Sequence, residues 1–225
     1  MFTDQNGTDF SASRRCLISA SVCFICVSVV CLLSFFKSEA VNIIDGSILE
    51  RIVQSRSCVP ETLALLLSLP FNTGGMLTIT SGVLIWSYLK RIRLLCFSCL
   101  FSVSGASLCS AALKLSISRP RPGLSFLPLV REDFFSMPSG HSTSAAALLM
   151  IIVICLFHFN LSLSAKIAYS SLIIIGILGV AWSRLYLAVH YPCDVLAGLL
   201  LGTAWACLGY GLAAALLKRL KEKAA

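Results

Sequence analysis

The stretch CLISASVCFICVSVVCLLSFF, residues 16–36, contains no charged side chain and ends at Lys37. A helix needs about 20 apolar residues to cross roughly 30 Å of hydrocarbon, and this run is long enough to do so. Arg14 and Arg15 precede it, as basic residues precede the core of a secretory signal peptide, but the run is longer than such cores usually are. It therefore predicts an uncleaved transmembrane helix.

The composition of the whole chain leads to the same class of protein. Of its 225 residues, 57% are hydrophobic and only 12% are charged, and the mean hydropathy is +0.89. A soluble domain usually has about 25% charged residues, and disordered or nucleic-acid-binding chains need many charges as well. The net charge of +8 therefore indicates basic loops beside anionic lipid, and no nucleic-acid partner. We expect an integral membrane protein that forms one domain over residues 1–225.

Five further apolar segments are candidates for membrane spans. They cover residues 62–89, 94–113, 139–159, 167–182 and 195–217. The first of them is longer than one span needs, and Pro70 with Gly74-Gly75 divides it into an interfacial entry and a true span. The fold class that follows is all-α: a polytopic membrane bundle of six transmembrane helices.

The basic residues predict the orientation of this bundle. The side that carries both termini receives ten of them and the other side receives eight, of which Lys114, Arg121 and Arg184 are assigned to chemistry below. The remaining bias places both termini in the cytoplasm and the loop over residues 115–138 outside.

The connection between the first two spans has helical periodicity. Ile44, Ile48, Leu49, Ile52 and Val53 recur at helical spacing with polar residues between them. This pattern is typical of an amphipathic helix on the outer membrane interface, and equally of a plain connector with helical bias.

Most of the eleven cysteines lie inside apolar runs, where cysteine packs as a small hydrophobic residue. The sequence leaves open whether Cys58 and Cys193 pair outside the membrane.

Three polar clusters lie at outer helix ends, where buried charges are costly and count as functional candidates. The first is KLSISRPRP, residues 114–122. Its prolines stop the helix, so Lys114 and Arg121 can converge on one anion, which Arg binds as a planar fork and Lys as a point charge. A basic rim beside the lipid headgroups is the alternative interpretation.

The second cluster is Pro138-Ser139-Gly140-His141, immediately before an apolar run. Ser139 suits the N-cap, Gly140 lets a ligand approach the backbone, and the helix N-terminus attracts an anion. His141 can donate a proton as a general acid. The alternative is an ordinary capped helix with an interfacial histidine.

The third cluster is SRLYLAVHYPCD, residues 183–194. Pro192 fits the first position of the last span, so Asp194 in its first turn can reach back to His190. A carboxylate on one imidazole nitrogen fixes the tautomer and frees the other nitrogen for attack. The alternative, a metal held by His141, His190 and Asp194, conflicts with the neighbouring cations, which would repel it.

Together, the clusters indicate phosphoryl transfer. Lys114, Arg121, Arg184 and a helix terminus face a phosphate, the pair of His190 and Asp194 attacks phosphorus, and His141 protonates the leaving oxygen. The chain has neither a G-x-x-x-x-G-K-[ST] loop nor a G-x-G-x-x-G loop, so we expect no nucleotide, no cofactor and no metal.

The three clusters resemble the signature of the type 2 phosphatidic acid phosphatase superfamily, K-x6-R-P, P-S-G-H and S-R-x5-H-x3-D, without substitution between residues 114 and 194. The resemblance implies a six-helix, metal-independent membrane phosphatase that works through a phosphohistidine. It makes His190 the nucleophile, Asp194 its partner and His141 the acid. The residues that would bind phosphate are Lys114, Arg121, Ser139, Gly140 and Arg184. Related soluble haloperoxidases share these residues, but this chain is too hydrophobic for that branch.

Arg119 and Arg131 lie outside the signature, and we expect them to tune substrate binding if they act at all. The substrate class that the resemblance implies is a membrane lipid phosphate. The predicted orientation places its cleavage at the outer face, and the short chain with few loops and no outward-facing glycosylation sequon favours a bacterial inner membrane. Polyprenyl diphosphate is our first choice, with phosphatidylglycerol phosphate, phosphatidic acid and lipid A phosphates as alternatives. A lipid phosphate transporter and a catalytically silent scaffold are the alternatives of another class. No oligomeric state is predicted.

Overall fold

The computed structural model describes residues 10–36, 38–56 and 61–224, and each regular element within these ranges is a helix. The α-helices are α1 (Phe10–Phe35), α2 (Glu39–Gln54), α3 (Glu61–Ser68), α4 (Thr73–Leu89), α5 (Arg93–Ile117), α6 (Gly140–Leu156), α7 (Leu163–Tyr186) and α8 (Pro192–Ala224). Two short 3₁₀ turns, η2 (Leu69–Phe71) and η3 (Leu124–Phe126), complete the elements. The all-helical class predicted from the sequence is confirmed.

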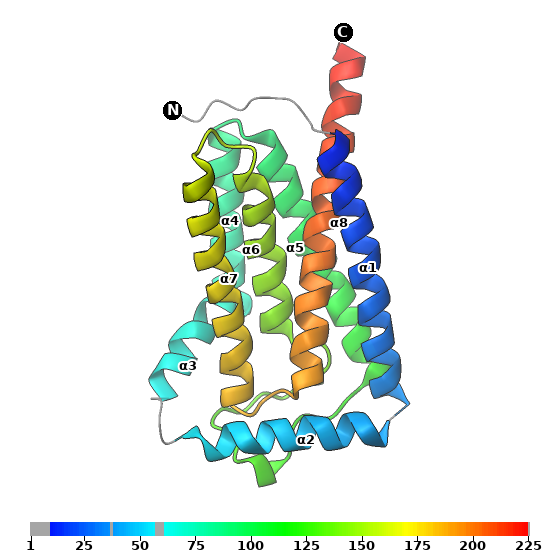
Figure 1. The fold of residues 1–225 in the computed structure, drawn as a ribbon, viewed down its shortest axis with the longest axis vertical. Helices are drawn as coiled ribbons and strands as arrows, with labels where there is room; N and C mark the ends of the chain where they lie inside the picture. Colours follow the sequence, from blue (N-terminus) through cyan, green and yellow to red (C-terminus); the bar gives the residue numbers. More distant parts are fainter. Residues whose placement is uncertain (1–9, 37, 57–60, 225) are drawn as a thin grey trace.

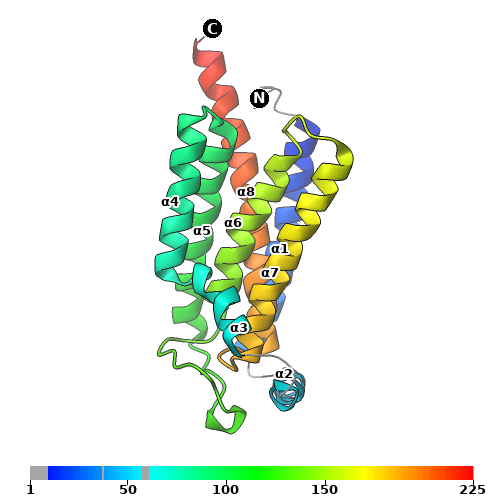
Figure 2. The ribbon, with the colours of Figure 1, turned by 90° about the vertical axis from the view of Figure 1, so that its left-hand side faces the viewer.

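Helix α8 is the central element of the bundle and packs against α1, α5 and α6. In Figure 1, α1 and α4 to α8 run along the long axis, while α2 lies across one end of the bundle. Figure 2 shows α2 nearly end-on at that same end, beside the loop that joins α5 to α6. The polar clusters of the sequence therefore gather at the end that α2 crosses.

Glycines let α8 approach α6 closely. A Cβ atom added to Gly202 would lie 2.3 Å from the carbonyl oxygen of Thr143, and one added to Gly198 would lie 2.7 Å from that of Ser139. Small residues allow such backbone contact between helices in a membrane, where van der Waals packing contributes much of the association. The contact fixes the N-terminus of α6 beside that of α8, where the Ser139 amide donates to the Asp194 carbonyl at 2.9 Å.

Four helices of the described residues are long and apolar enough to cross a membrane: α1 over Ser13–Phe35, α5, α7 and α8 over Pro192–Lys223. A fifth span results if α3 and α4 are taken together across their 53° bend. Pro70 lies in the 3₁₀ turn at this bend, and the Asn72 side chain accepts the Gly75 amide at 2.7 Å to begin α4. The predicted break at Pro70 is thus present, while the assignment of α3 to the interface stays a prediction.

Helix α6 is shorter than the sequence suggested. It has 17 residues and ends at Leu156, whereas the apolar run continues to residue 159. Helix α8 is longer than predicted and continues beyond the apolar run into a basic, helix-favouring segment. Its start at Pro192 agrees with the prediction.

The connection between the first two spans is a helix, α2, and not a plain connector. It turns Asp45 and Leu49 toward the bundle, where both are fully buried, while Ile44 and Ile48 stay exposed. Its end is tied down by Arg56, which donates to the carbonyls of Tyr186 at 2.8 Å and Leu127 at 2.6 Å. Helix α2 is therefore part of the structure around the polar end.

Candidate active site

His190 lies in the short turn between α7 and α8 and is almost completely buried, at 1% exposure. The turn begins after Tyr186, and Ala188 takes a positive φ of 53° in it. Burial lowers the pKa of His190 to about 4, against the opposing effect of Asp194, so the ring is neutral at pH 7. A neutral imidazole has a nitrogen lone pair available for attack.

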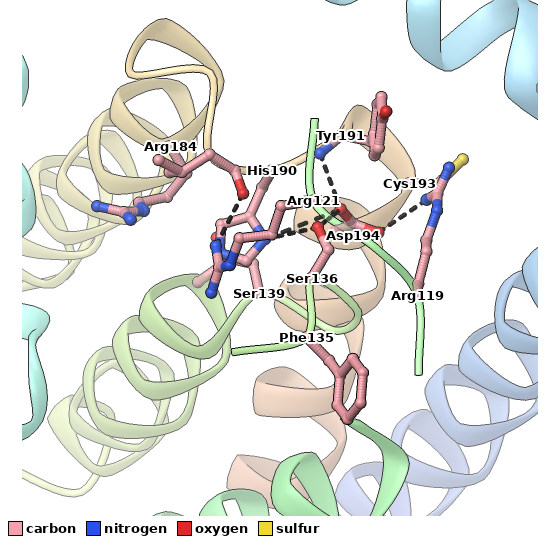
Figure 3. A network of polar contacts seen from close by, with 12 residues as sticks. Arg119, Arg121, Phe135, Ser136, Ser139, Arg184, His190, Tyr191, Cys193 and Asp194 are labelled. Atoms are coloured by element: carbon pink, nitrogen blue, oxygen red, sulfur yellow. Dashed lines mark hydrogen bonds and ion pairs between the residues drawn. The ribbon is translucent and has the colours of Figure 1, made fainter. Parts of the chain in front are cut away.

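The two ring nitrogens of His190 face different surroundings (Figure 3). Nδ1 lies 3.8 Å from Asp194 Oδ2 and 3.3 Å from the Ser136 hydroxyl. Nε2 lies 3.2 Å from Arg121 Nη1 and 3.9 Å from Glu132 Oε2. The side of the ring toward the cations is the one from which attack on an anionic group can occur.

Asp194 is held by three groups in addition to its proximity to the histidine. Its Oδ2 accepts hydrogen bonds from the Tyr191 amide at 2.8 Å and from the Ser136 hydroxyl. Its Oδ1 accepts from Arg119 Nη1 at 2.7 Å. The predicted reach of Asp194 back toward His190 is therefore present, and Ser136 lies beside both side chains.

The two predicted phosphate-binding arginines meet at the Glu132 carboxylate. Arg121 Nη2 lies 2.7 Å from Glu132 Oε2, and Arg184 Nη2 donates to Glu132 Oε1. Burial opposes the charge of Glu132, but Arg184 and Arg121 outweigh it and hold the pKa of Glu132 below its ordinary value. We call Arg121, Arg184 and the Nε2 side of His190 the anion cradle; a carboxylate already lies in it.

The cradle has unused binding capacity. The Nε atom of Arg184 is buried and has no hydrogen-bond partner among the described residues. Arg121 is fixed by its bonds to the carbonyls of Phe134 at 2.5 Å and Val189 at 2.8 Å. Burial lowers the pKa of Arg121, and the neighbouring Glu132 and Asp194 oppose this effect. A tetrahedral anion has more oxygen acceptors than a carboxylate and suits this set of donors.

The other predicted residues lie beside the cradle. Ser139 occupies the N-cap position of α6, but its side chain makes no capping bond, so it does not compete with a ligand for the first amides. Lys114 donates to the Phe135 carbonyl at 2.6 Å, rather than meeting Arg121 at the Glu132 carboxylate. Lys114, Gly140 and His141 line a cleft of about 540 Å³ between α4, α5 and α6.

Three residues of this site had no role assigned from the sequence, and a fourth, Arg119, which was expected to tune substrate binding if it acted at all, bonds two carboxylates. Glu132 fills the cradle, Ser136 bonds Asp194, and Asp45 with Arg119 extends the network to α2. Asp45 lies at helical spacing from Leu49 and Ile52, but the segment contains other polar residues as well, so the sequence alone does not single it out. Nothing in the sequence distinguishes Ser136 from the other serines.

The remaining predictions have simple outcomes. Arg131 is exposed and pairs with the exposed Asp133 at 3.0 Å. The Cys193 amide donates to Asp45 at 2.9 Å, and Cys58 lies outside the described residues. Within the described ranges, no three His, Cys, Asp or Glu side chains gather as metal ligands would.

Comparisons with known proteins find a family model that covers the three motifs and the α5–α6 loop, but not Asp45 on α2. The model of the PAP2 superfamily matches residues 93–217. Phosphatidylglycerophosphatase B of Bacillus subtilis (strain 168) is 44% identical over 97 residues, which are 42% of this chain and 46% of that protein. The match thus spans less than half the length of that curated relative.

A solved structure shares the fold. The crystal structure of a transmembrane PAP2-type phosphatidylglycerolphosphate phosphatase from Bacillus subtilis superimposes with a TM-score of 0.71. The alignment covers 86% of this chain and 95% of that one, at 24% sequence identity. The likeness extends over the bundle and not only over the motifs.

Proposed function

The chain belongs to the PAP2 superfamily, whose model covers more than half of its residues, and we propose on that premise that it is a membrane lipid phosphatase. The substrate we propose is phosphatidylglycerol phosphate, from which the enzyme removes the terminal phosphate. The activity named for the B. subtilis relatives supports this choice over polyprenyl diphosphate, the first choice from the sequence alone. Phosphatidic acid and lipid A phosphates remain alternatives.

One observation carries the proposal: a carboxylate lies between Arg121 and Arg184 with one oxygen 3.9 Å from His190 Nε2. A phosphate that replaces this carboxylate keeps the same ionic contacts and brings phosphorus toward Nε2. Positioning and electrostatic stabilisation of this kind account for most of the catalysis of phosphoryl transfer.

The reaction then proceeds in two steps. The lone pair on His190 Nε2 attacks phosphorus, the bond from phosphorus to the glycerol oxygen breaks, and His141 gives its proton to that oxygen. A water molecule next attacks the phosphohistidine, His141 takes up the water proton, and the bond from nitrogen to phosphorus breaks to release inorganic phosphate. Asp194 stabilises the imidazole cation between the steps.

The remaining donors bind the phosphate oxygens in this proposal. Lys114 and Arg184 supply charge, while Ser139 and Gly140 place the free amides of α6 beside the ligand. A Cβ atom on Gly140 would have Lys114 Cε, at 4.0 Å, as its nearest neighbour, so protein packing does not demand glycine there. The proposal includes no metal, since the arginines and the lysine provide the positive charge.

The cleft beside the cradle supports a lipid substrate. It leads from Lys114, Gly140 and His141 along apolar side chains of α4 and α5, among them Met76, Leu77 and Val103. An acyl chain buries apolar surface there at about 25 cal/mol per Å², whereas a soluble phosphate ester has nothing to place in it.

The proposed topology follows the sequence. The bent pair of α3 and α4 forms one span and α6 forms another, which brings the total to six and places both termini in the cytoplasm. The site then lies on the outer face of a bacterial inner membrane. We treat residues 1–225 as one domain.

Phosphate release by detergent-purified protein tests the function. The four candidate lipids are offered in the presence of EDTA, with His190→Ala as the blank and His158→Ala as the matched control. His158 bonds Tyr210 at 2.8 Å in the connection between α6 and α7, away from the cradle, so its loss should leave activity unchanged. Release that EDTA abolishes would refute the metal-free mechanism, and no release from any lipid would favour the transporter or the scaffold.

A further inference from the structure

A buried chain of charges runs from α2 to the catalytic carboxylate. Arg119 Nη2 lies 2.6 Å from Asp45 Oδ2, and Arg119 Nη1 lies 2.7 Å from Asp194 Oδ1. Asp45 and Asp194 are fully buried and Arg119 is only 9% exposed. Figure 3 shows Asp194 between His190 on one side and Arg119 on the other. Asp194 is therefore linked through Arg119 to Asp45 on α2, on the side away from His190.

Asp45 and Arg119 each contact further groups besides the carboxylates and the guanidinium of this network. The second oxygen of Asp45 accepts the Cys193 amide at 2.9 Å, which ties α2 to the first turn of α8. The Arg119 guanidinium also lies over the Tyr191 ring, 4.5 Å from its centre. Burial acts against the charge of Arg119, but Asp194 and Asp45 outweigh it and raise the pKa of Arg119, so the guanidinium stays charged.

The net charge of Asp45, Arg119 and Asp194 shows that the network does more than hold Asp194 in place. Asp45, Arg119 and Asp194 carry one positive and two negative charges, so the network retains one net negative charge beside His190. If Arg119 paired with Asp194 alone, that pair would be neutral and would stabilise an imidazole cation less. Asp45 thus preserves the charge that the catalytic carboxylate needs.

We infer that Asp45 and Arg119 are positioning residues, through which the interfacial helix α2 fixes Asp194 and, through it, the attacking histidine. The inference rests on the proposed function. It adds α2 to a site otherwise built from α5, α6, α7, α8 and the connections between them. Neither residue is a specified position of the three motifs that resemble the family signature, and Arg119 occupies a variable position of the first.

Other groups also determine the charge at the histidine. Those that face His190 are Asp194 on α8, Arg184 on α7, His141 on α6, and Arg121 and Glu132 on the α5–α6 loop. None of these residues is itself substituted in the Asp45 and Arg119 variants, and of them Asp194 alone bonds Arg119 directly. The two replacements therefore isolate the contribution of the network.

The test compares Asp45→Asn with Arg119→Lys. Asp45→Asn removes one negative charge, so kcat should fall about 10- to 100-fold, as is typical when an outer partner of a functional group is lost. The acid limb of kcat/KM should move to lower pH, because the His190 cation loses stabilisation. Arg119→Lys keeps the charge but loses the fork that reaches both carboxylates, so kcat should fall while the limb stays in place.

Two further readouts separate positioning from folding and from phosphate binding. KM and the inhibition constant of inorganic phosphate should stay within about twofold in both variants, because the anion cradle is untouched. Glu50→Gln is the matched control: it makes the same charge change on the exposed side of α2, and should behave as wild type.

The outcomes are distinct. Wild-type kcat in Asp45→Asn, with active wild-type protein, overturns the inference and leaves the proposed function standing. An inactive wild type overturns the proposed function and the inference with it. Failure of both variants to fold overturns positioning in favour of a structural role, as does a lower melting temperature with unchanged kcat.

Discussion

The two nitrogens of His190 have different tasks in the proposed reaction, since Nδ1 faces Asp194 and Nε2 faces the anion cradle. His190→Ala removes the attacking atom, whereas Asp194→Asn only weakens orientation and cation stabilisation. We expect His190→Ala to lower kcat about 10⁶-fold and Asp194→Asn to cost less, about 10⁴-fold, by analogy with the nucleophile and carboxylate of other covalent enzymes. Phosphate release in single-turnover assays measures both. Equal losses would mean that Asp194 does more than orient.

Burial of His190 predicts an unusual pH profile. Its folded pKa of about 4 lies below the ordinary value of 6.5, so the neutral nucleophile persists as the pH falls through that interval. The acid limb of kcat/KM should therefore appear near pH 4. The substrate phosphate has its own second ionisation at about pH 6. A limb that moves when a substrate with a different phosphate pKa is used belongs to the substrate and not to the enzyme. A limb at pH 6.5 that belongs to the enzyme would contradict the burial of the ring.

Glu132 occupies the cradle that phosphate has to enter. Glu132→Gln removes its charge and leaves Arg121 and Arg184 without an anionic partner, so inorganic phosphate should inhibit about tenfold more strongly, which corresponds to roughly 1.4 kcal/mol. The inhibition constant against the lipid substrate measures this. Asp133→Asn is the matched control, because Asp133 is exposed and pairs only with Arg131 among the ion pairs described. Equal inhibition in both variants would show that Glu132 does not compete with phosphate.

At the scale of elements, the contact between α6 and α8 sets the distance between two parts of the site. A methyl group at Gly202 would lie 2.3 Å from the Thr143 carbonyl, so Gly202→Ala should push the helices apart and destabilise the protein by about 1–3 kcal/mol. Gly176→Ala is the control, because nothing lies within 4 Å of a Cβ atom at that position of α7. Thermal unfolding in detergent compares the two. Similar melting temperatures would mean that α6 and α8 can adjust.

Elements were predictable from the sequence to different degrees. The long apolar runs predicted the membrane helices. Pro70 predicted a break and Pro192 a helix start, because proline restricts its own backbone and lacks an amide hydrogen, whatever the rest of the fold. Helix α2 was open to two interpretations because its buried face contains Asp45, and a charged residue at a buried position does not belong to a hydrophobic pattern. Its partner Arg119 is 74 residues away in the sequence, so only the fold reveals the pair.

The site itself was predictable where a residue type implies its chemistry. His190, Asp194, Arg121 and Arg184 were chosen by charge and spacing, and the structure places them at one end of the bundle. Glu132 was missed because a phosphate-binding set gives no reason to look for an anion. The three motifs describe groups that bind phosphate, so they do not include a carboxylate that occupies the same place as the ligand.

At the scale of the whole molecule, the proposed six-span topology predicts that the C-terminus and the α5–α6 loop lie on opposite sides of the membrane. A green fluorescent protein joined after Ala225 should fluoresce, because it folds in the cytoplasm. A reporter that is active only outside the cytoplasm should work when inserted at Gly123. The reverse result, or both reporters on one side, would contradict six spans or the assigned orientation.

The crosswise position of α2 has a consequence for the surroundings in which the protein works. If α2 fixes Asp194 while Ile44 and Ile48 stay exposed toward the interface, the height of the bilayer surface along the bundle affects the position of α2. Through α2 it then affects the position of Asp194. Bilayer thickness is then expected to alter turnover with no change in the protein. A micelle, whose boundary is curved and mobile, fixes this height less well than a flat bilayer does. Changing the chain length of the lipid in a bilayer should therefore alter turnover, as a substitution in the network would.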